Sequence, residues 1–298
     1  MEAADALAPR PRRSAGRRLA DLLHRRPRLQ VGGLLGLPLG WLVVGYLGSL
    51  AVLLFAAFWT VSALTGEVSQ TFSIDNFQSL VEDPVYRTIA WRTVSVAALV
   101  TITDAVLAFP IAFYMAKIAR PRVKAGLVVA ILMPLWSFYL VKVYAWRTML
   151  STDGIVNWAL SPLGLHGPGY GTAAVWLVMS YLWLPYMILP IFAGLERIPD
   201  SLLSASEDLG ASPFTTFRRV IFPLAFPAVV AGSIFTFSLT LGDYITPTLV
   251  SNNQFIGNVV YSNITNNLPL ASAFATVPIV VMIGYLLLAR RLGAFEHL

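Results

Sequence analysis

The sequence contains no cysteine, only three histidines and few charged residues. Without cysteine there is no disulfide framework and no thiol chemistry. The histidines, His24, His166 and His297, lie far apart along the chain and predict no metal site. Charged residues make up 12% of the 298 residues and hydrophobic residues 57%, whereas soluble domains carry about 25% charge. This shortage of charge excludes an ordinary soluble domain and indicates an integral membrane protein.

The sequence also lacks the motifs of a catalytic site. It has no Gly-x-x-x-x-Gly-Lys-Ser/Thr segment for nucleotide phosphates. No Ser-His-Asp set and no other glycine-rich phosphate loop stands out. We therefore expect no catalytic residues and no cofactor on this chain, which disfavours an intramembrane enzyme.

Long hydrophobic runs are abundant. About 20 apolar residues cross a bilayer as a helix, and six runs reach that length. The first run is too long for the core of a signal peptide, so we expect it to be retained. We predict an arginine-rich arm at 1–33 and one membrane domain at 34–298. The predicted spans are roughly 37–63, 93–116, 125–146, 172–194, 221–244 and 271–289.

Positive charge is concentrated in alternate loops, and this pattern predicts the orientation of the chain. Residues 1–28 carry a net charge of +5 out of +6 for the whole chain. The 117–124 loop, the 195–220 loop and the C-terminal tail are also basic, whereas the loops between them are poorer in Lys and Arg. The positive-inside rule therefore places both termini and the 195–220 loop in the cytoplasm. We interpret the basic arm as an orienting, lipid-facing segment and not as a nucleic-acid site.

The 195–220 loop is a polar stretch in an otherwise hydrophobic sequence. Asp200 or Ser201 could cap a first helix, and Gly210 could end it in a left-handed conformation. Ser212 could cap a second helix with Pro213 at its first position. The loop therefore predicts two short helices meeting at a corner, either to dock on another protein or as a plain interfacial helix–turn–helix. The apolar side chains that could seat the corner in a partner are Leu202, Leu203, Leu209 and Phe214.

The same loop resembles the cytoplasmic signature of ABC importer permeases. That signature is Glu-Ala-Ala, three residues, Gly, nine residues, Ile, one residue and Leu-Pro. Here the positions are Ser204-Ala205-Ser206, Gly210, Val220 and Phe222-Pro223. The spacing matches in full, and the main departure is Ser204 in place of Glu. The resemblance covers about residues 70–298.

The resemblance implies an all-helical, six-span, type I (MetI-like) importer permease that is not itself an enzyme. It implies a coupling helix that sits in a cleft of a cytoplasmic ATPase dimer, with ATP and Mg²⁺ bound by that partner. It also implies alternating access in a bacterial inner membrane, a second homologous permease and an extracytoplasmic solute-binding protein. The implied coupling residues are Ser204, Ala205, Ser206, Glu207, Asp208, Gly210, Ala211, Ser212 and Phe214.

Three stretches are similar to the spermidine/putrescine-type (PotB-like) branch of these permeases. They are MPLWSFYLVKVYAWRTML at 133–150, DLGASPFTTFRRVIFPL at 208–224 and LGDYITPTLVSNNQFIGNVV at 241–260. The last contains the Gly-Asp-Tyr, Thr-Pro and Ile-Gly-Asn steps of that branch. The branch implies a polyamine solute. An aminophosphonate, an amino acid-like compound and a chelated metal are the alternative solutes for the same type of importer.

Two acidic residues in the predicted spans, Asp104 and Asp243, could guide a cationic solute. An unpaired acid in mid-membrane costs about 2.5–3.5 kcal/mol, so such acids face a cavity or a partner. Aromatic rings beside them could add cation–π contacts. The predicted pathway residues are Asp104, Asp243, Tyr244, Trp136, Tyr139 and Tyr144.

Structural roles are the alternative for these residues. Asp104 could pair with Lys142, although their depths differ by roughly 9 Å at 1.5 Å per residue, or it could hydrogen-bond a threonine. The aromatic residues could simply pack. An ATP-independent secondary transporter could couple ions through Asp104 and Lys142, but it would leave the polar loop unexplained.

Overall fold

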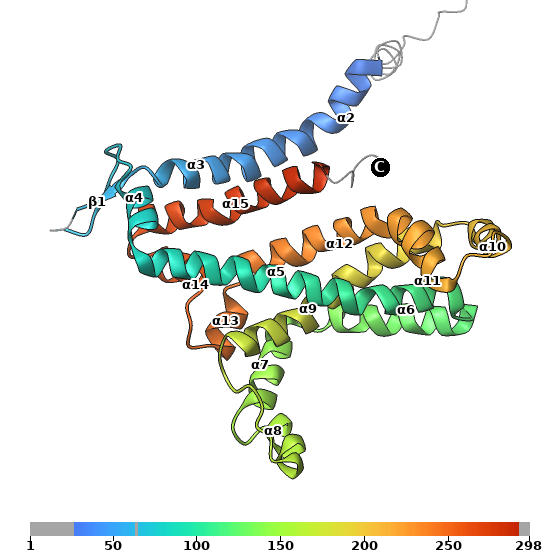
Figure 1. Ribbon diagram of the computed structural model, residues 1–298. Helices are drawn as coiled ribbons and strands as arrows, with labels where there is room; N and C mark the ends of the chain where they lie inside the picture. The colour runs from blue at the N-terminus through green and yellow to red at the C-terminus, as the bar shows by residue number, and fades with distance from the viewer. Residues whose placement is uncertain (1–26, 63–64, 292–298) are drawn as a thin grey trace, which may run out of the picture. The chain divides into compact units, whose positions relative to one another are not determined.

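The computed structural model describes residues 27–62 and 65–291, which are mostly helical (Figure 1). The chain divides into two compact units, residues 1–55 and 56–298. The first contains α2 (Pro27–Trp41), the π-helix η1 (Leu42–Leu47) and most of α3 (Gly48–Ala56). The stretch Leu34–Ala56 is long and apolar enough to cross a membrane. Most of the predicted basic arm lies outside the described residues, so the boundary at 33 stays a prediction.

The second unit opens with a two-stranded hairpin that the sequence analysis did not anticipate. Its strands, β1 (Thr60–Val61) and β2 (Val68–Ser69), pair antiparallel. Helices follow up to residue 291. They are α4 (Asp75–Glu82), α5 (Pro84–Phe113), the π-helix η2 (Tyr114–Ile118), α6 (Pro121–Trp136), α7 (Tyr139–Leu150), α8 (Ile155–Leu160), the 3₁₀ helix η3 (Ser161–Leu163), α9 (Thr172–Glu196), α10 (Asp200–Asp208), α11 (Pro213–Thr216), the π-helix η4 (Phe217–Ile221), α12 (Phe222–Gly242), α13 (Ile245–Val250), α14 (Ile256–Asn263) and α15 (Leu268–Arg291).

The predicted spans correspond to these helices, with corrections to the first three. The first ends at Ala56 and not at residue 63, because β1 follows it. Five stretches of the described chain are long and apolar enough to cross a membrane, and a sixth span is possible as a bent pair. The prediction of one continuous helix at 125–146 is wrong, because α6 and α7 meet at 92°. The second span also begins earlier than predicted, at Pro84, where the Asp83 side chain accepts a hydrogen bond from the amide of Val85.

The break between α6 and α7 has a local cause. Pro134 has no amide hydrogen, so α6 loses a hydrogen bond near its end. Side chains also satisfy the C-terminal end of α6: the carbonyl of Pro134 accepts hydrogen bonds from Ser137 Oγ at 3.0 Å and Lys142 Nζ at 2.9 Å. A cation at a helix C-terminus is favourable because carbonyl dipoles point at it. The Lys142 ammonium therefore binds the end of α6, and it does not form the ion pair with Asp104 that the sequence allowed.

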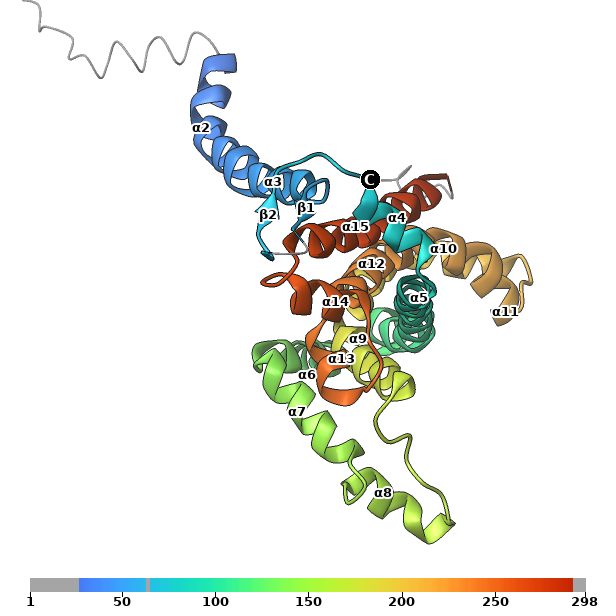
Figure 2. The ribbon, with the colours of Figure 1, turned by 90° about the vertical axis from the view of Figure 1, so that its left-hand side faces the viewer.

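Helices α5, α9 and α12 pack against one another and form the centre of the second unit (Figures 1 and 2). Small residues allow the close approach. Ala108 and Ala112 of α5 are fully buried, and a Cβ on Gly232 of α12 would lie 2.8 Å from Sδ of Met187 on α9. This packed trio holds the 195–220 loop, which joins α9 to α12.

The two ends of the second unit differ. The loop with α10 and α11 lies at the same end as the turn between η2 and α6 and the last turn of α15 (Figure 1). The hairpin, α4 and α14 lie at the other end. The basic loops that were predicted to share the cytoplasmic side are therefore at one end of the unit. Helices α7 and α8 project sideways from the trio (Figures 1 and 2).

Candidate functional site

The 195–220 loop forms a rigid corner between α10 and α11. Gly210 has φ +74°, the left-handed conformation expected from the sequence. Its amide donates to the Glu207 carbonyl at 2.8 Å, and the amide of Ala211 donates to the Ser206 carbonyl at 3.1 Å. These two bonds complete a Schellman motif, which satisfies the open carbonyls at the end of α10. The predicted helix end at Gly210 is confirmed.

The start of α11 also agrees with the sequence. Ser212 Oγ accepts a hydrogen bond from the amide of Thr215 at 3.3 Å, and Pro213 occupies the first helical turn. Across the corner, the hydroxyls of Ser206 and Thr216 lie 2.8 Å apart. Because α10 and α11 are linked both through the backbone and through these side chains, the corner can transmit force as one body.

The start of α10 differs from the prediction. Pro199 precedes the helix, and no side-chain oxygen caps it. The Asp200 carboxylate instead accepts a hydrogen bond from Lys117 Nζ at 2.8 Å, and the same ammonium donates to the Ile198 carbonyl at 2.6 Å. The amide-capping role is therefore wrong for Asp200, because its side chain is held by Lys117 of η2.

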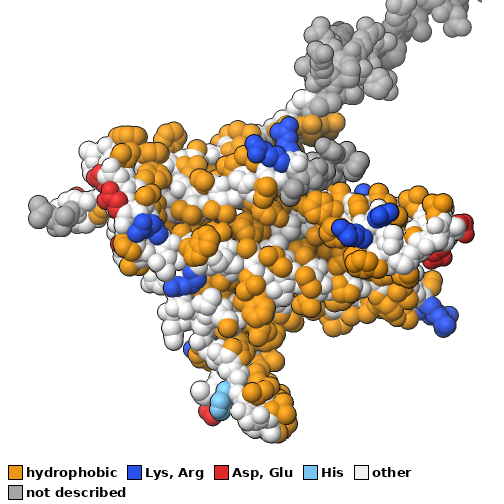
Figure 3. Space-filling view, viewed as in Figure 1, with side chains coloured by type: hydrophobic (Ala, Val, Ile, Leu, Met, Phe, Trp, Pro, Cys, Tyr) orange, Lys and Arg blue, Asp and Glu red, His pale blue; other side chains and the backbone are white. Residues whose placement is uncertain are grey.

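The tip of the corner presents apolar side chains to the outside. Leu209 is 88% exposed and Phe214 is 70% exposed, while Leu203 is partly buried. Acidic side chains lie beside hydrophobic ones at this tip (Figure 3), and Glu207 and Asp208 of α10 are exposed. Exposed aromatic and aliphatic side chains held by a rigid backbone are typical of a docking surface.

Replacing Gly210 with alanine tests the rigidity of the corner. An alanine at positive φ is strained by about 1 kcal/mol relative to glycine, while its Cβ would meet no other atom within 4 Å. We expect limited proteolysis at the corner to become roughly fivefold faster, with helix content unchanged. Asparagine tolerates this conformation better, so Gly210→Asn should fall between the two. Equal proteolysis of all three proteins would contradict a left-handed corner.

The pair formed by Lys117 and Asp200 predicts a pH dependence. The hydrogen bond and charge of Lys117 lower the pKa of Asp200 below its usual range. A lowered pKa in the folded protein means that the pair stabilises the loop at neutral pH, and that this contribution is lost as the pH falls below about 4. Asp200→Asn should therefore speed hydrogen–deuterium exchange at 198–204 at pH 7, and its difference from the unmodified protein should shrink as the pH is lowered below about 4. Asp208→Asn, at the far end of α10, is the control and should change exchange there at neither pH.

A second cluster surrounds Asp243, where α12 ends and α13 begins. Oδ1 accepts hydrogen bonds from the amides of Ile245 at 2.9 Å and Thr246 at 3.3 Å. Oδ2 accepts from the hydroxyls of Thr246 at 2.7 Å and of Tyr139. Tyr139 is the first residue of α7, so one carboxylate joins the second half of the bent α6–α7 pair to the α12–α13 turn. The ring of Tyr139 also stacks on Trp183 of α9, with centroids 5.8 Å apart.

Two separate sequence motifs pack together here. Gly257 lies against the backbone of Asp243, where a Cβ would sit 2.8 Å from the carbonyl oxygen. The side-chain amide of Asn258 donates to the Tyr244 carbonyl at 3.1 Å and to Thr248 Oγ1 at 2.6 Å. The Gly-Asp-Tyr and Ile-Gly-Asn steps are therefore one structural unit that fixes the turn around Asp243.

Asp104 lies elsewhere, inside the packed helices. Its side chain is fully buried, and neither carboxylate oxygen has a hydrogen-bond partner among the described residues. Ser180 of α9 lies beside it, and Trp183, one turn further along α9, has an unpaired indole N–H in the described chain. The expected threonine partners are absent there: Thr101 bonds the Ala97 carbonyl, and Thr103 accepts from Trp176 at 3.0 Å. Asp104 is therefore an enclosed acid that borders the same face of α9 as the Tyr139 stack.

The remaining predicted pathway residues are not gathered around Asp243 by their side chains. Trp136 is 89% exposed at the end of α6, and Tyr144 is 48% exposed on α7. Tyr244 stacks on Tyr261, with centroids 4.5 Å apart. The structure thus brings Asp243 and Tyr139 together, keeps Asp104 enclosed and leaves Trp136 and Tyr144 on the surface.

Several residues of both clusters were missed by the sequence analysis. Lys124 pairs with Glu196 at 2.5 Å and, with Lys117, ties the loop to the start of α6. The signal was available, because basic residues in one loop faced acidic residues in another loop of the same predicted side. Thr246, Trp183 and Ser180 had no such signal, since nothing in a lone threonine, tryptophan or serine reports its spatial neighbours.

Comparison with known proteins shows the family of the chain. Residues 88–295 match the family described as binding-protein-dependent transport system inner membrane components. The inner membrane ABC transporter permease protein YdcU of Escherichia coli is 43% identical, over 97% of each chain. The spermidine/putrescine permease PotB of Haemophilus influenzae is 32% identical, over 72% of this chain and 78% of that protein.

Solved structures agree on the fold. Two crystal structures of a bacterial alginate ABC transporter, one with a periplasmic protein bound to an alginate pentasaccharide, superpose with TM-scores of 0.70 and 0.69 at 17% and 16% identity. They cover 92% of this chain and 99% and 98% of theirs. The chain therefore belongs to the binding-protein-dependent transport system inner membrane components, the non-catalytic permease subunits of ABC importers.

Proposed function

We propose that this importer permease carries a small cationic solute, a polyamine of the spermidine or putrescine type. The likeness to a spermidine/putrescine permease at 32% identity supports this solute class. Family membership also removes the ATP-independent secondary transporter as an alternative. An aminophosphonate, an amino acid-like compound and a chelated metal are the competing solutes for the same machine.

The observation that carries the proposal is the Asp243 cluster. A carboxylate, a tyrosine hydroxyl and the stacked rings of Tyr139 and Trp183 meet where the broken span α6–α7 passes the end of α12. A break in a membrane helix leaves backbone groups without helical partners, and transport sites are often built at such breaks. An ammonium group could share the charge of Asp243 and lie against an aromatic face. Trp136, Tyr144 and Tyr244 stay part of the proposed route, although their side chains lie outside this cluster.

Asp104 is a second acid in this proposal. It is enclosed between α5 and α9, so a solute could reach it only when these helices separate. Among the described residues, its two oxygens, the Ser180 hydroxyl and the Trp183 indole N–H have no hydrogen-bond partner. Buried polar groups without partners are rare and demand an explanation. A route that opens during the transport cycle would supply partners for them.

The assembly around this chain is part of the proposal. The corner at Ser204–Phe214 would dock in a cleft of a cytoplasmic ATPase dimer, which would bind ATP and Mg²⁺ itself. A second, similar permease would enclose the route, and a periplasmic solute-binding protein would deliver the polyamine. Closure of the ATPase dimer would then reach α12 through α11 and η4, producing alternating access.

ATP hydrolysis by the purified complex in lipid, with its binding protein, tests this function. The solute panel is spermidine, putrescine, an aminophosphonate, amino acids and ferric chelates. We expect spermidine or putrescine to stimulate hydrolysis, and the binding protein without solute to serve as the baseline. Stimulation by another solute would support the importer assembly and contradict the polyamine as its solute. Failure of any ATPase to copurify with the chain would overturn the assembly.

A further inference from the structure

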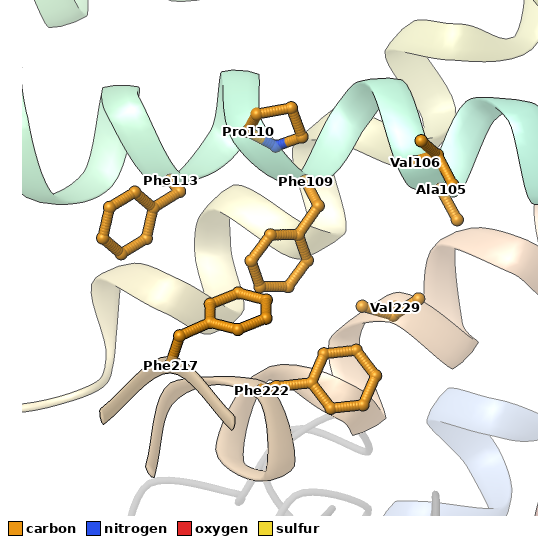
Figure 4. Close-up of a pocket in the computed structure, with 8 residues that line it drawn as sticks. All are labelled: Ala105, Val106, Phe109, Pro110, Phe113, Phe217, Phe222 and Val229. Atoms are coloured by element: carbon orange, nitrogen blue, oxygen red, sulfur yellow. The ribbon is translucent and has the colours of Figure 1, made fainter. Parts of the chain in front are cut away.

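An apolar pocket of about 560 Å³ lies on the second unit between α5 and the start of α12 (Figure 4). Ala105, Phe109 and Phe113 of α5 form one wall, and Phe217, Phe222 and Val229 form the other. The rings of Phe109 and Phe217 meet edge to face, with centroids 5.4 Å apart, and Phe222 lies tilted against both. The pocket therefore has aromatic walls that are held in place by one another.

The pocket opens outward and not into the core. Val106 at its rim is 67% exposed and Phe222 is 41% exposed. The pocket belongs to helices that cross the membrane, so its mouth meets lipid hydrocarbon. Apolar walls favour an apolar occupant, because transfer of hydrocarbon out of water or into a better-packed site is favourable. An acyl chain has the chemistry that this pocket fits.

Charge in the segment that follows the lining residue Phe217 indicates the kind of lipid. Arg218 and Arg219 directly follow Phe217 in η4, and both are exposed. Neither makes a salt bridge within the described part of the chain. Basic side chains stand in otherwise hydrophobic surface around the start of α12 (Figure 3). This end of the unit carries the basic loops and is therefore the cytoplasmic end, where the leaflet holds anionic lipids.

We propose that this pocket binds an anionic phospholipid of the cytoplasmic leaflet. One acyl chain fills the space between Phe109 and Phe222, and the phosphate group lies at Arg218 and Arg219. Basic pockets between membrane helices on the cytoplasmic side bind lipid headgroups in this way. Because Phe217 and Phe222 flank the segment that joins the 195–220 corner to α12, the lipid would brace the element through which coupling passes.

Native mass spectrometry of the full-length chain tests the site. The protein is purified from nanodiscs that contain equal amounts of phosphatidylglycerol and phosphatidylethanolamine, and retained lipids are counted. Val106→Trp fills the mouth of the pocket from an exposed position, so it does not disturb the core. Arg218→Gln with Arg219→Gln removes the charge. Arg290→Gln with Arg291→Gln, at the end of α15 on the same side, removes equal charge away from the pocket.

We expect both pocket variants to retain at least fivefold less phosphatidylglycerol, and the Arg290/Arg291 variant to stay within twofold of the unmodified protein. Equal losses in both arginine variants would mean general surface attraction and overturn the site. Unchanged phosphatidylglycerol retention in the Val106→Trp variant would overturn the site too. So would a result in which the variants lose the mass peak of a permease dimer but keep their lipid. The readout needs neither ATPase nor solute, so its failure would leave the proposed import function untouched.

Discussion

Replacing Leu209 and Phe214 together with aspartate is expected to abolish solute-stimulated ATP hydrolysis while the permease still inserts and folds. Both side chains protrude from the corner, at 88% and 70% exposure, and support no core of their own. Apolar anchors at the centre of an interface typically contribute about 2–4 kcal/mol each when truncated. Docking should therefore weaken at least thirtyfold, and charge placed in an apolar cleft adds a desolvation penalty.

The measurement is ATPase activity of the reconstituted complex, together with copurification of the ATPase subunit. Val81→Asp is the matched control, because Val81 is a 68% exposed aliphatic residue of α4, at the opposite end of the unit. It should leave hydrolysis within twofold of the unmodified complex. Normal stimulation in the Leu209/Phe214 variant would remove the docking role of the corner. Loss in both variants would point to a general folding defect instead.

Changing Asp243 to asparagine is expected to lower polyamine transport by at least tenfold with little change in the unfolding temperature. Asparagine keeps an oxygen for the amides of Ile245 and Thr246, and its NH₂ can donate to the two hydroxyls that bonded Oδ2. The local fold therefore survives, while the negative charge is lost. A charge-assisted hydrogen bond to an ammonium is worth about 1.5–3 kcal/mol, or a factor of about 10 to 150.

Asp243→Ala is the companion variant. It removes the cap of α13 and the link to Tyr139, so it should lower both transport and thermal stability. Tyr139→Phe keeps the stack on Trp183 and deletes one hydroxyl. It should therefore lower transport less than Asp243→Asn or Asp243→Ala does. Solute uptake in proteoliposomes and a thermal unfolding scan separate these cases. If Asp243→Asn transports normally, Asp243 is only a structural link and the solute proposal loses its main support.

Local sequence patterns determined the corner almost completely. Gly210, Ser212 and Pro213 act on backbone groups within four residues, so their effects do not depend on the rest of the fold. The same holds for the number of long hydrophobic runs, because membrane crossing depends on length and composition. The charge of the loops likewise predicted which loops would lie at the same end of the unit, since each of these loops is basic by itself.

Contacts between distant segments could not be derived in that way. Asp243 looked like a free acid in the sequence, yet it caps α13 and accepts from Tyr139, which is 104 residues away. Lys142 looked like a partner for Asp104, yet it caps the end of α6 instead. Each of these side chains could reach several partners, and only the packing of the helices decided which one it met.

The sequence by itself determined that the chain is a helical membrane protein with a rigid polar corner, because those properties arise from composition and from interactions between near neighbours. The tertiary structure alone decided the enclosure of Asp104 and the meeting of α7, α9 and α13 at Asp243. The physical reason is that hydrogen bonds and close packing require specific atoms within a few ångströms, and a sequence does not state which distant atoms meet.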